Sequence, residues 1–199
     1  MTRKKLIIIW GSAISLGALL ALAIIFSGKP NKPSSTLDTK SLSSWIGQTA
    51  PDFALKDKKG LEVKLGDYRG RNLVLFFNEG IMCYPACWNQ IAALGQDPKL
   101  NNDRVASLTV VNDAPADWLH AGQKMPELAS ARIIFDSELS VSQAYRVLSL
   151  PSSMHRGSRA GHTYFVIDPE GVIRYASDDV SMGVHNEHLI AEIQKIEAR

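Results

Sequence analysis

The sequence has few of the features that mark a cross-linked chain or a chain that binds polyanions. It contains two cysteines in 199 residues, at positions 83 and 87, which excludes a framework of several disulfides. Its 22 lysines and arginines nearly balance its 20 aspartates and glutamates, so the net charge of +2 gives no signal of nucleic-acid binding. No internal repeat is visible. We therefore expect no nucleic-acid partner and one ordinary globular domain with an appendage.

Charged residues are also absent from residues 6–26, LIIIWGSAISLGALLALAIIF. At about 1.5 Å of rise per residue, a helix of this length crosses a hydrocarbon core of about 30 Å. The basic residues 3–5 precede it, and the positive-inside rule then leaves the N-terminus in the cytoplasm. A cleaved signal peptide would be shorter and would end in small residues, which residues 26–30 do not provide. We predict a cytoplasmic N-terminus (1–5) and a single-pass transmembrane anchor (6–26) in the lipid bilayer of a bacterial cell membrane.

Residues 27–44 have too little apolar content to pack, and they are rich in serine, lysine and proline. This composition is typical of a flexible linker. Apolar periodicity resumes at Trp45 and continues to the C-terminus. We therefore predict a folded domain over residues 45–199, outside the cytoplasm.

The folded domain alternates between strand and helix patterns, which predicts an α/β fold with a parallel or mixed sheet. A short hairpin is expected around Gly60, and Asp168-Pro169-Glu170-Gly171 is expected to form the turn of another. The other predicted strands are 73–77, 105–111, 133–135, 163–167 and 172–176, and the predicted helices are 88–94, 116–123, 140–148 and 186–198.

The two cysteines lie where a strand is expected to become a helix, in Cys83-Tyr84-Pro85-Ala86-Cys87. Unpaired amide groups and the helix dipole stabilise a thiolate in the first turn of a helix, and Cys83 suits this position. Cys87, one helical turn later, suits a thiol that resolves a mixed disulfide or a sulfenic acid. Pro85 fixes its own φ, which favours a tight loop. This pattern predicts a redox-active pair, and the alternative is a structural disulfide or two inert buried thiols.

Three further residues are candidates for supporting roles. His162, whose pKa is ordinarily near neutrality, could stabilise a thiolate as an imidazolium or carry a proton, or it could be an exposed or hydrogen-bonded structural histidine. Glu79 could accept a proton from the resolving thiol, or it could be a plain loop carboxylate. Trp88 directly follows Cys87, and we predict that it packs over the site and shields the disulfide, although core packing alone would account for it.

Several motifs between residues 45 and 199 resemble the redoxin group of the thioredoxin superfamily, which includes peroxiredoxin-like AhpC/TSA proteins and membrane-tethered thiol-disulfide oxidoreductases. The resemblance implies a thioredoxin-like fold, with a central mixed sheet flanked by helices. It also implies that Cys83 is the nucleophile and Cys87 the resolving thiol, exposed at the N-terminus of the first main helix. The motifs are Ala50-Pro51-Asp52-Phe53-Ala54-Leu55, Gly60, Val63, Leu65, Tyr68-Arg69-Gly70-Arg71, residues 73–77 and Tyr164-Phe165-Val166-Ile167-Asp168-Pro169-Glu170-Gly171.

The sequence departs from this group near the cysteines. Tethered thiol-disulfide oxidoreductases usually carry C-x2-C, whereas three residues separate Cys83 from Cys87. Peroxiredoxins usually show a Pro and a Thr before the peroxidatic cysteine, and residues 78–82 contain neither. Gly161-His162-Thr163 occupies the place where thioredoxins have a cis-proline. The sequence therefore leaves both peroxide reduction and disulfide exchange open.

We expect an antioxidant thiol oxidoreductase that needs no cofactor. In this hypothesis Cys83 attacks a protein disulfide or a peroxide, Cys87 closes the intramolecular disulfide, and a separate thiol-reducing partner restores the dithiol. The alternative is a copper chaperone, because two thiols and a distant imidazole also suit copper. Sco-type copper proteins are similar in being membrane-anchored and built on C-x3-C, which implies Cys83, Cys87 and His162 as ligands.

Overall fold

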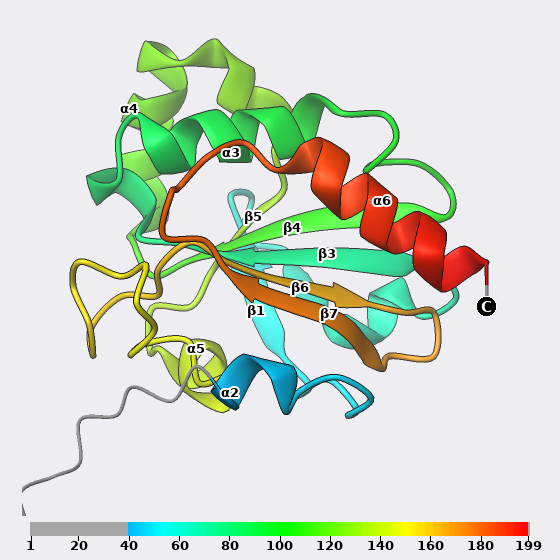
Figure 1. Ribbon diagram of the computed structural model, residues 1–199. Coiled ribbons are helices and arrows are strands. Elements are labelled where there is room, and N and C mark those ends of the chain that lie inside the picture. Colours follow the sequence, from blue (N-terminus) through cyan, green and yellow to red (C-terminus); the bar gives the residue numbers. More distant parts are fainter. Residues whose placement is uncertain (1–39, 199) are drawn as a thin grey trace, which may run out of the picture. The chain divides into compact units, whose positions relative to one another are not determined.

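The computed structural model describes residues 40–198 of the chain (Figure 1). The predicted N-terminus (1–5), anchor (6–26) and linker up to residue 39 lie outside these residues. Within residues 40–198 no helix is both long and apolar enough to cross a membrane. Residues near the end of the predicted linker form the short helix α2 (Lys40–Ser43), and Leu42 of this helix packs against the core. The folded part therefore begins before Trp45.

A seven-stranded mixed sheet forms the centre of the domain, in the order β2-β1-β5-β4-β3-β6-β7. Its middle strands β5, β4 and β3 are parallel to one another, and the pairs on either side of them are antiparallel. The strands are β1 (Ala54–Asp57), β2 (Glu62–Lys64), β3 (Asn72–Phe77), β4 (Val105–Val111), β5 (Ile133–Phe135), β6 (Thr163–Ile167) and β7 (Ile173–Asp178).

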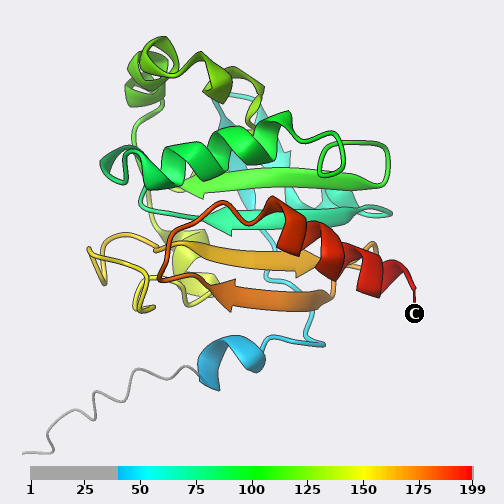
Figure 2. The ribbon, with the colours of Figure 1, turned by 45° about the horizontal axis from the view of Figure 1, so that its top comes forward.

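Helices cover both faces of this sheet, so every residue of β3, β4 and β6 is buried. Figures 1 and 2 both show α3 (Ala86–Gln96) and α6 (Asn186–Glu197) over one face, and Figure 1 shows α2 and α5 (Ser140–Ala144) at the other. The domain also contains α4 (Pro115–Lys124) and the 3-10 turns η1 (Leu65–Tyr68), η2 (Gly80–Met82) and η3 (Pro126–Ser130).

Two hydrophobic clusters fill the space between the sheet and the helices. The α5-side cluster contains Trp45, Phe77, Tyr145 and Phe165. The α3-side cluster contains Phe76, Trp88, Trp118 and Tyr164. Alternate residues of β3 thus point to opposite clusters, as the period of a strand requires.

The predicted central mixed sheet flanked by helices is confirmed. The hairpin around Gly60 is also present, since β1 pairs antiparallel with β2 and Gly60 has a φ of +76°. The helix predicted over 140–148 is shorter and ends at Ala144. It stops because the backbone of Arg146 adopts a left-handed φ of +56°.

Candidate active site around Cys83 and Cys87

The cysteine pair lies beside one edge of the sheet, where three loops meet. Because β3 and β4 are parallel, the loops that follow them leave from the same edge. β6 is antiparallel to β3, with Phe77 paired to Thr163, so the loop that precedes β6 arrives at this edge as well. Open α/β sheets commonly place functional sites at the carboxyl ends of their parallel strands.

Cys83 and Cys87 are joined by a disulfide, with their Cα atoms 5.3 Å apart. The amide of Cys87 donates to the carbonyl oxygen of Cys83 at 2.9 Å. Cys87 lies in the first turn of α3, and Pro85 immediately precedes this helix. The first-turn position predicted for Cys83 is wrong, because η2 and the Tyr84-Pro85 link separate β3 from the helix.

The disulfide is buried beneath its neighbours. Cys83 is 5% exposed and Cys87 is 1% exposed, so the exposure implied for these cysteines is wrong in the disulfide-bonded form. The neighbouring residues Met82 and Tyr84 are instead exposed to solvent, at 56% and 67%. A molecule that approaches the pair therefore meets apolar and aromatic surface first, and Cys83 is the more accessible of the two cysteines.

Glu79 ties the cysteine loop to the loop that precedes β6. Its side chain is fully buried, and Oε1 accepts hydrogen bonds from the amides of Met154 at 2.6 Å and His155 at 2.9 Å. Oε1 also accepts from the hydroxyl of Ser153 at 3.1 Å and lies 3.3 Å from Nδ1 of His155. Oε2 has no hydrogen-bond partner among residues 40–198. Glu79 is therefore a buried carboxylate that holds two loops together, and its role as a proton acceptor stays a prediction.

Asp113 and Arg159 form a second connection. Nη1 of Arg159 donates to Oδ1 of Asp113 at 2.6 Å and to the carbonyl oxygen of Glu79 at 3.0 Å. Oδ2 of Asp113 accepts from the amide of Ile81 at 2.9 Å. The segment before Cys83 is thus held at two backbone groups by one ion pair, in which Asp113 is buried and Arg159 is partly buried.

Gly80 permits this close approach of Asp113. Its φ is +65°, a conformation that other residues rarely adopt, and a Cβ atom there would lie 1.8 Å from Oδ2 of Asp113. Only glycine fits between the carboxylate and the start of η2.

His162 lies one residue before β6, on the α3 side of the sheet. Its ring centroid is 4.7 Å from that of Phe76 and 5.8 Å from that of Tyr164. It is fully buried, and neither ring nitrogen has a hydrogen-bond partner in the described part of the chain. Burial lowers its pKa to about 4, against a smaller raising effect of Asp179. The ring is therefore neutral near pH 7, and neither an imidazolium nor an exposed or hydrogen-bonded histidine matches this environment.

Trp88 packs beside the cysteine loop, as predicted. Its ring lies edge-to-face with that of Tyr84, with centroids 5.0 Å apart, and 6.2 Å from that of Trp118. Ile81, Tyr84 and Trp88 line a groove of about 460 Å³ between this loop and α4. Shielding of the disulfide by Trp88 stays a prediction.

Gln90 fixes the cysteine-bearing helix α3 to the start of α6. It is fully buried, and its Oε1 accepts from the hydroxyl of Tyr164 at 3.1 Å and the amide of His185 at 2.6 Å. Its Nε2 donates to Oδ1 of Asn186 at 2.9 Å. Gln90 therefore has partners for both ends of its amide, in a network that holds α3 in one position.

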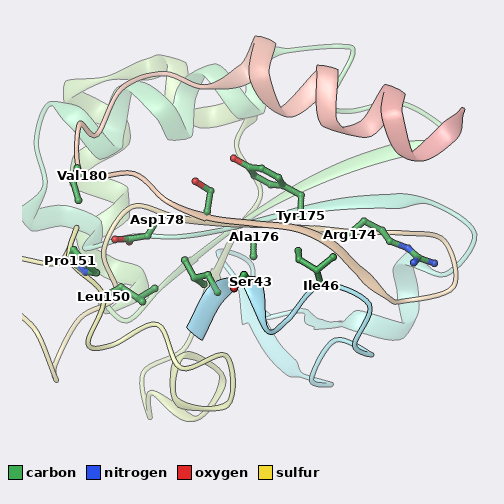
Figure 3. Close-up of a pocket in the computed structure, with 11 residues that line it drawn as sticks. Ser43, Ile46, Leu150, Pro151, Arg174, Tyr175, Ala176, Asp178 and Val180 are labelled. Atoms are coloured by element: carbon green, nitrogen blue, oxygen red, sulfur yellow. The ribbon is translucent and has the colours of Figure 1, made fainter. Parts of the chain in front are cut away.

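Another pocket, of about 590 Å³, lies between α2 and β7 (Figure 3). Ile46, Leu150 and Ala176 contribute apolar atoms to it, and Arg174 and Asp178 contribute charge. No residue of the cysteine loop or of α3 lines this pocket. The groove beside Trp88, in contrast, is lined by Ile81 and Tyr84 of the cysteine loop.

The copper alternative gains no support from residues 40–198. No group of three His, Cys, Asp or Glu side chains in this range could hold a metal ion. The sulfurs of Cys83 and Cys87 are bonded to each other, and His162 is buried against aromatic rings.

Sequence reasoning missed Asp113, Arg159 and Gln90. Asp113 has a usable signal, because it follows the predicted buried strand 105–111 almost directly and so stands at the carboxyl edge of the sheet. Arg159 lies in an irregular loop, and its partners come from positions 79, 112 and 113. No spacing in the sequence indicates that contact.

Comparisons with known proteins place this geometry in a family context. The model of the AhpC/TSA family matches residues 46–176. Alkyl hydroperoxide reductase E of Mycobacterium bovis is 32% identical over 66% of this chain and 83% of its own length. Peroxiredoxin Bcp of Escherichia coli is 27% identical over 71% of this chain and 90% of its own.

Solved structures agree on the fold. The reduced 2-Cys peroxiredoxin of Plasmodium vivax superposes with a TM-score of 0.64 at 20% sequence identity. The superposition covers 77% of this chain and 82% of that one. The thioredoxin-like fold, predicted for residues 45–199, is thereby confirmed in the part of the chain that the structure describes.

Proposed function

Because the chain belongs to the AhpC/TSA family, a family of thiol oxidoreductases, we propose that it reduces peroxides through a dithiol–disulfide cycle of Cys83 and Cys87. One observation carries the proposal: the two sulfurs are bonded in the folded domain. The fold thus accommodates the oxidised product of such a cycle. Peroxide is the substrate, and a thiol-reducing partner supplies the electrons.

Cys83 is assigned the first step because it is the more exposed of the pair, at 5% against 1% for Cys87. Its thiolate attacks an oxygen of the hydroperoxide ROOH, the O–O bond breaks, and ROH leaves after taking a proton. Cys83 then carries a sulfenic acid. The thiol of Cys87 attacks that sulfur, the disulfide forms and water leaves. Two thiols of the reductant later restore the dithiol and become a disulfide.

Two buried side chains take supporting roles in this proposal. Glu79 is buried and joins the cysteine loop to residues 153–155 through hydrogen bonds to Oε1, so it positions the loop. His162 is neutral and packs against Phe76 and Tyr164 on the α3 side of the sheet, so its role in this proposal is to support that face by packing and not to carry charge.

We also propose that residues 6–26 anchor the protein in the cell membrane, with the cycle running outside the cytoplasm. The uncharged length of this run and the basic residues 3–5 support the proposal. Disulfides persist in such a compartment until a reductant reaches them. Fractionation of cells and protease treatment of intact spheroplasts would test it, since an anchored outward domain is digested while a cytoplasmic one is protected.

The decisive experiment is stopped-flow oxidation of the reduced full-length chain by hydrogen peroxide and by an alkyl hydroperoxide, followed through tryptophan fluorescence. Trp88 adjoins Cys87 and should report disulfide closure. We expect C83S to abolish the reaction, and C87S to retain one turnover that leaves a sulfenic acid detectable with a dimedone probe. A wild-type rate no faster than that of a free thiolate would reject peroxide reduction.

Disulfide exchange with other proteins is the second candidate, and one observation favours it. The exposed side chains of Met82 and Tyr84 flank Cys83 and offer an apolar surface to a polypeptide. In this case the oxidised chain would pass its disulfide to a reduced, unfolded protein faster than peroxide oxidises the dithiol. Measuring both rates on the same preparation separates the two functions.

A further inference from the structure

Asn78 directly follows β3, in the segment that leads to Cys83. Its side chain is 1% exposed. Oδ1 of Asn78 accepts a hydrogen bond from the amide of Gly80 at 2.8 Å, and the carbonyl oxygen of Gly80 accepts one from the amide of Cys83 at 3.2 Å. Because only the oxygen of the side-chain amide can accept from Gly80, this bond also fixes the position of the nitrogen Nδ2. The side chain is therefore held in one orientation at the start of the cysteine loop.

The nitrogen Nδ2 of Asn78 has no hydrogen-bond partner among residues 40–198. Buried polar atoms are seldom left unpaired, so an unpaired one calls for an explanation. Gln90 shows the usual case, since the oxygen and the nitrogen of its buried amide both have partners. Nδ2 of Asn78 is thus a donor for which the disulfide-bonded form supplies no acceptor.

The alternation of β3 turns Asn78 toward α3. Phe76 belongs to the α3-side cluster, and Phe77, the last residue of β3, belongs to the α5-side cluster. Successive side chains of a strand point to opposite faces, so the side chain of Asn78 points back to the face that α3 covers. It lies beyond Phe76 by two residues, about 6.6 Å along the strand direction.

Cys87 lies on the side of α3 that faces the sheet. Cys87, Ile91 and Leu94 recur at helical spacing, and each is at most 1% exposed. Ile91 and Leu94 belong to the same cluster as Phe76. The side chain of Cys87 is therefore directed at the sheet and not at solvent.

The contacts of Gln90 show where Cys87 stands along β3. The amide oxygen of Gln90 accepts from the hydroxyl of Tyr164, and Tyr164 pairs with Phe76 across the sheet. Cys87 precedes Gln90 by three residues, about 4.5 Å of helical rise. Only residues 78–85 join the end of β3 to the start of α3, so this step leads toward the edge where β3 ends. Cys87 and Asn78 therefore face each other just beyond β3.

We propose that Asn78 donates a hydrogen bond from Nδ2 to the thiolate of Cys87 when the disulfide is reduced. This rests on the proposed function and deepens it, because Cys87 is the resolving thiol of that cycle. Sulfur in a disulfide is a weak acceptor, whereas a thiolate carries a negative charge and accepts more strongly. Nδ2 is thus unpaired in the oxidised form and paired in the reduced form. It adds to the amide groups in the first turn of α3, which also stabilise a thiolate at Cys87.

Both halves of the cycle use this thiolate. During reduction, a thiolate of the reductant attacks the sulfur of Cys83, the S–S bond breaks, and the electron pair goes to the sulfur of Cys87. During oxidation, the thiolate of Cys87 attacks the sulfenic sulfur of Cys83, the disulfide forms, and the departing hydroxide takes a proton to give water. A stabilised thiolate leaves faster, and a larger thiolate fraction attacks more often. Asn78 therefore assists each step at Cys87.

The test measures the ionisation of each cysteine separately in the full-length chain. Cys83→Ser leaves Cys87 as the only thiol, and Cys87→Ser leaves Cys83. The ultraviolet absorbance of the thiolate, recorded across pH, gives its fraction in each background. We expect Asn78→Leu to lower the thiolate fraction of Cys87 at pH 7 by about tenfold, in line with a lost hydrogen bond to a charged group. The thiolate fraction of Cys83 should change by less than about twofold.

Asn78→Asp separates the donor from the acceptor. Aspartate keeps an oxygen for the amide of Gly80 but has no nitrogen, so it should also fail to keep the wild-type thiolate fraction of Cys87. Leucine adds no charge and aspartate keeps the turn, so the two variants together exclude charge repulsion and a lost turn as the cause. Asn72→Leu is the matched control, because Asn72 is a buried asparagine at the other end of β3. It should leave both cysteines unchanged.

A wild-type thiolate fraction of Cys87 in Asn78→Leu or in Asn78→Asp would overturn the proposal, as would equal losses at Cys83 and Cys87. If Asn78→Leu does not fold, the comparison of Asn78→Asp with Asn72→Leu decides the matter in the same way. Because no peroxide is present, these results do not depend on peroxidase activity. Failure of the dithiothreitol-reduced chain to consume peroxide would instead reject the proposed function.

Discussion

The two faces of the sheet are built from similar aromatic residues but differ in what lies among them. On the α5 side, the ring centroids of Tyr145 and Phe165 lie 5.1 Å apart. The hydroxyl of Tyr145 donates a hydrogen bond to the carbonyl oxygen of Pro51 at 2.9 Å. On the α3 side, Phe76 and Tyr164 stack at 4.6 Å, and fully buried Gln90 and His162 lie beside them. The first face is mainly apolar, with hydroxyl groups such as those of Ser142 and Thr163 buried near it, whereas the second holds a buried amide and a buried imidazole beside its rings.

This difference suggests that the α5 side contributes to the stability of the fold, whereas the α3 side also contributes to the redox reaction. Buried polar groups cost free energy unless they are paired, so an apolar cluster is the cheaper way to hold a sheet together. On the α3 side, polar groups are buried at this free-energy cost, and this is the face covered by the helix that carries Cys87. The comparison predicts that substitutions on the α5 side change stability alone, whereas those on the α3 side and at the loop edge change the redox reaction as well.

The largest expected effect comes from Phe165→Ala on the α5 side. Phe165 is fully buried in contact with Trp45, Phe77 and Tyr145, so its loss should destabilise the domain by about 3–5 kcal/mol. Below the unfolding temperature of the variant, the rate of peroxide oxidation of the dithiol should stay within about twofold of wild type. Urea unfolding and stopped-flow fluorescence measure the two quantities.

Phe76→Ala is the matched control on the opposite face, with a similar loss of buried area. It should cost similar stability and also slow oxidation, because Phe76 contacts His162. The comparison of faces breaks down if Phe165→Ala slows oxidation as much as Phe76→Ala does.

Much of the fold follows from local sequence patterns. The apolar runs at 73–77 and 105–111 predict β3 and β4 because strands buried on both faces need no polar alternation. The start of α3 is less evident from the sequence, which predicts Cys83 in its first turn, whereas the helix begins at Ala86. No local pattern reports η2, because its geometry depends on Asp113, which is distant in sequence and binds the amide of Ile81.

The site shows the same limit. Cys83, Cys87 and Trp88 are recognisable from their spacing, but the environments of Glu79 and His162 depend on tertiary contacts. Glu79 is buried because three groups of residues 153–155 converge on its Oε1. His162 is neutral because the sheet and α3-side cluster exclude water from it. Charge and burial of this kind are set by packing, which a single sequence does not display.

The next largest effect is the loss of folding stability at low pH that the titration of His162 causes. It tests the comparison of the two faces because His162 lies on the α3 side. Its pKa of about 4 in the folded state lies below the ordinary value of 6.5, so between these values the unfolded chain binds a proton that the folded chain does not. Stability is therefore fully present above pH 6.5 and falls as pH drops toward 4, by on the order of 3 kcal/mol. Urea unfolding at pH 7.5 and pH 4.5 measures this loss.

His162→Phe should remove that part of the acid sensitivity while leaving the contribution of the carboxylates. His120→Gln is the control, because His120 is exposed on α4. This variant should lose as much stability between pH 7.5 and pH 4.5 as the wild type does. Equal losses of stability in wild type and His162→Phe between the two pH values would show that His162 is not the buried titrating group.

The smallest of these effects concerns Arg159, at the edge where the loops meet. Arg159→Met removes three hydrogen bonds and leaves the buried carboxylate of Asp113 without its cationic partner, at a cost of about 2 kcal/mol. Because Arg159 also holds the carbonyl oxygen of Glu79, the loop before Cys83 should loosen and oxidation by peroxide should slow by about tenfold.

Arg156→Met separates this positioning role from a general effect of charge. Arg156 lies in the same loop, is exposed, and binds only the carbonyl oxygen of Pro151 among residues 40–198. It carries the same charge but does not touch the cysteine loop, so its loss should change neither stability nor rate appreciably. If both variants slowed oxidation equally, Arg159 would act on Cys83 through its positive charge and not through its hydrogen bonds. If only Arg159→Met does so, the clamp on residues 79–81 sets the geometry in which Cys83 reacts.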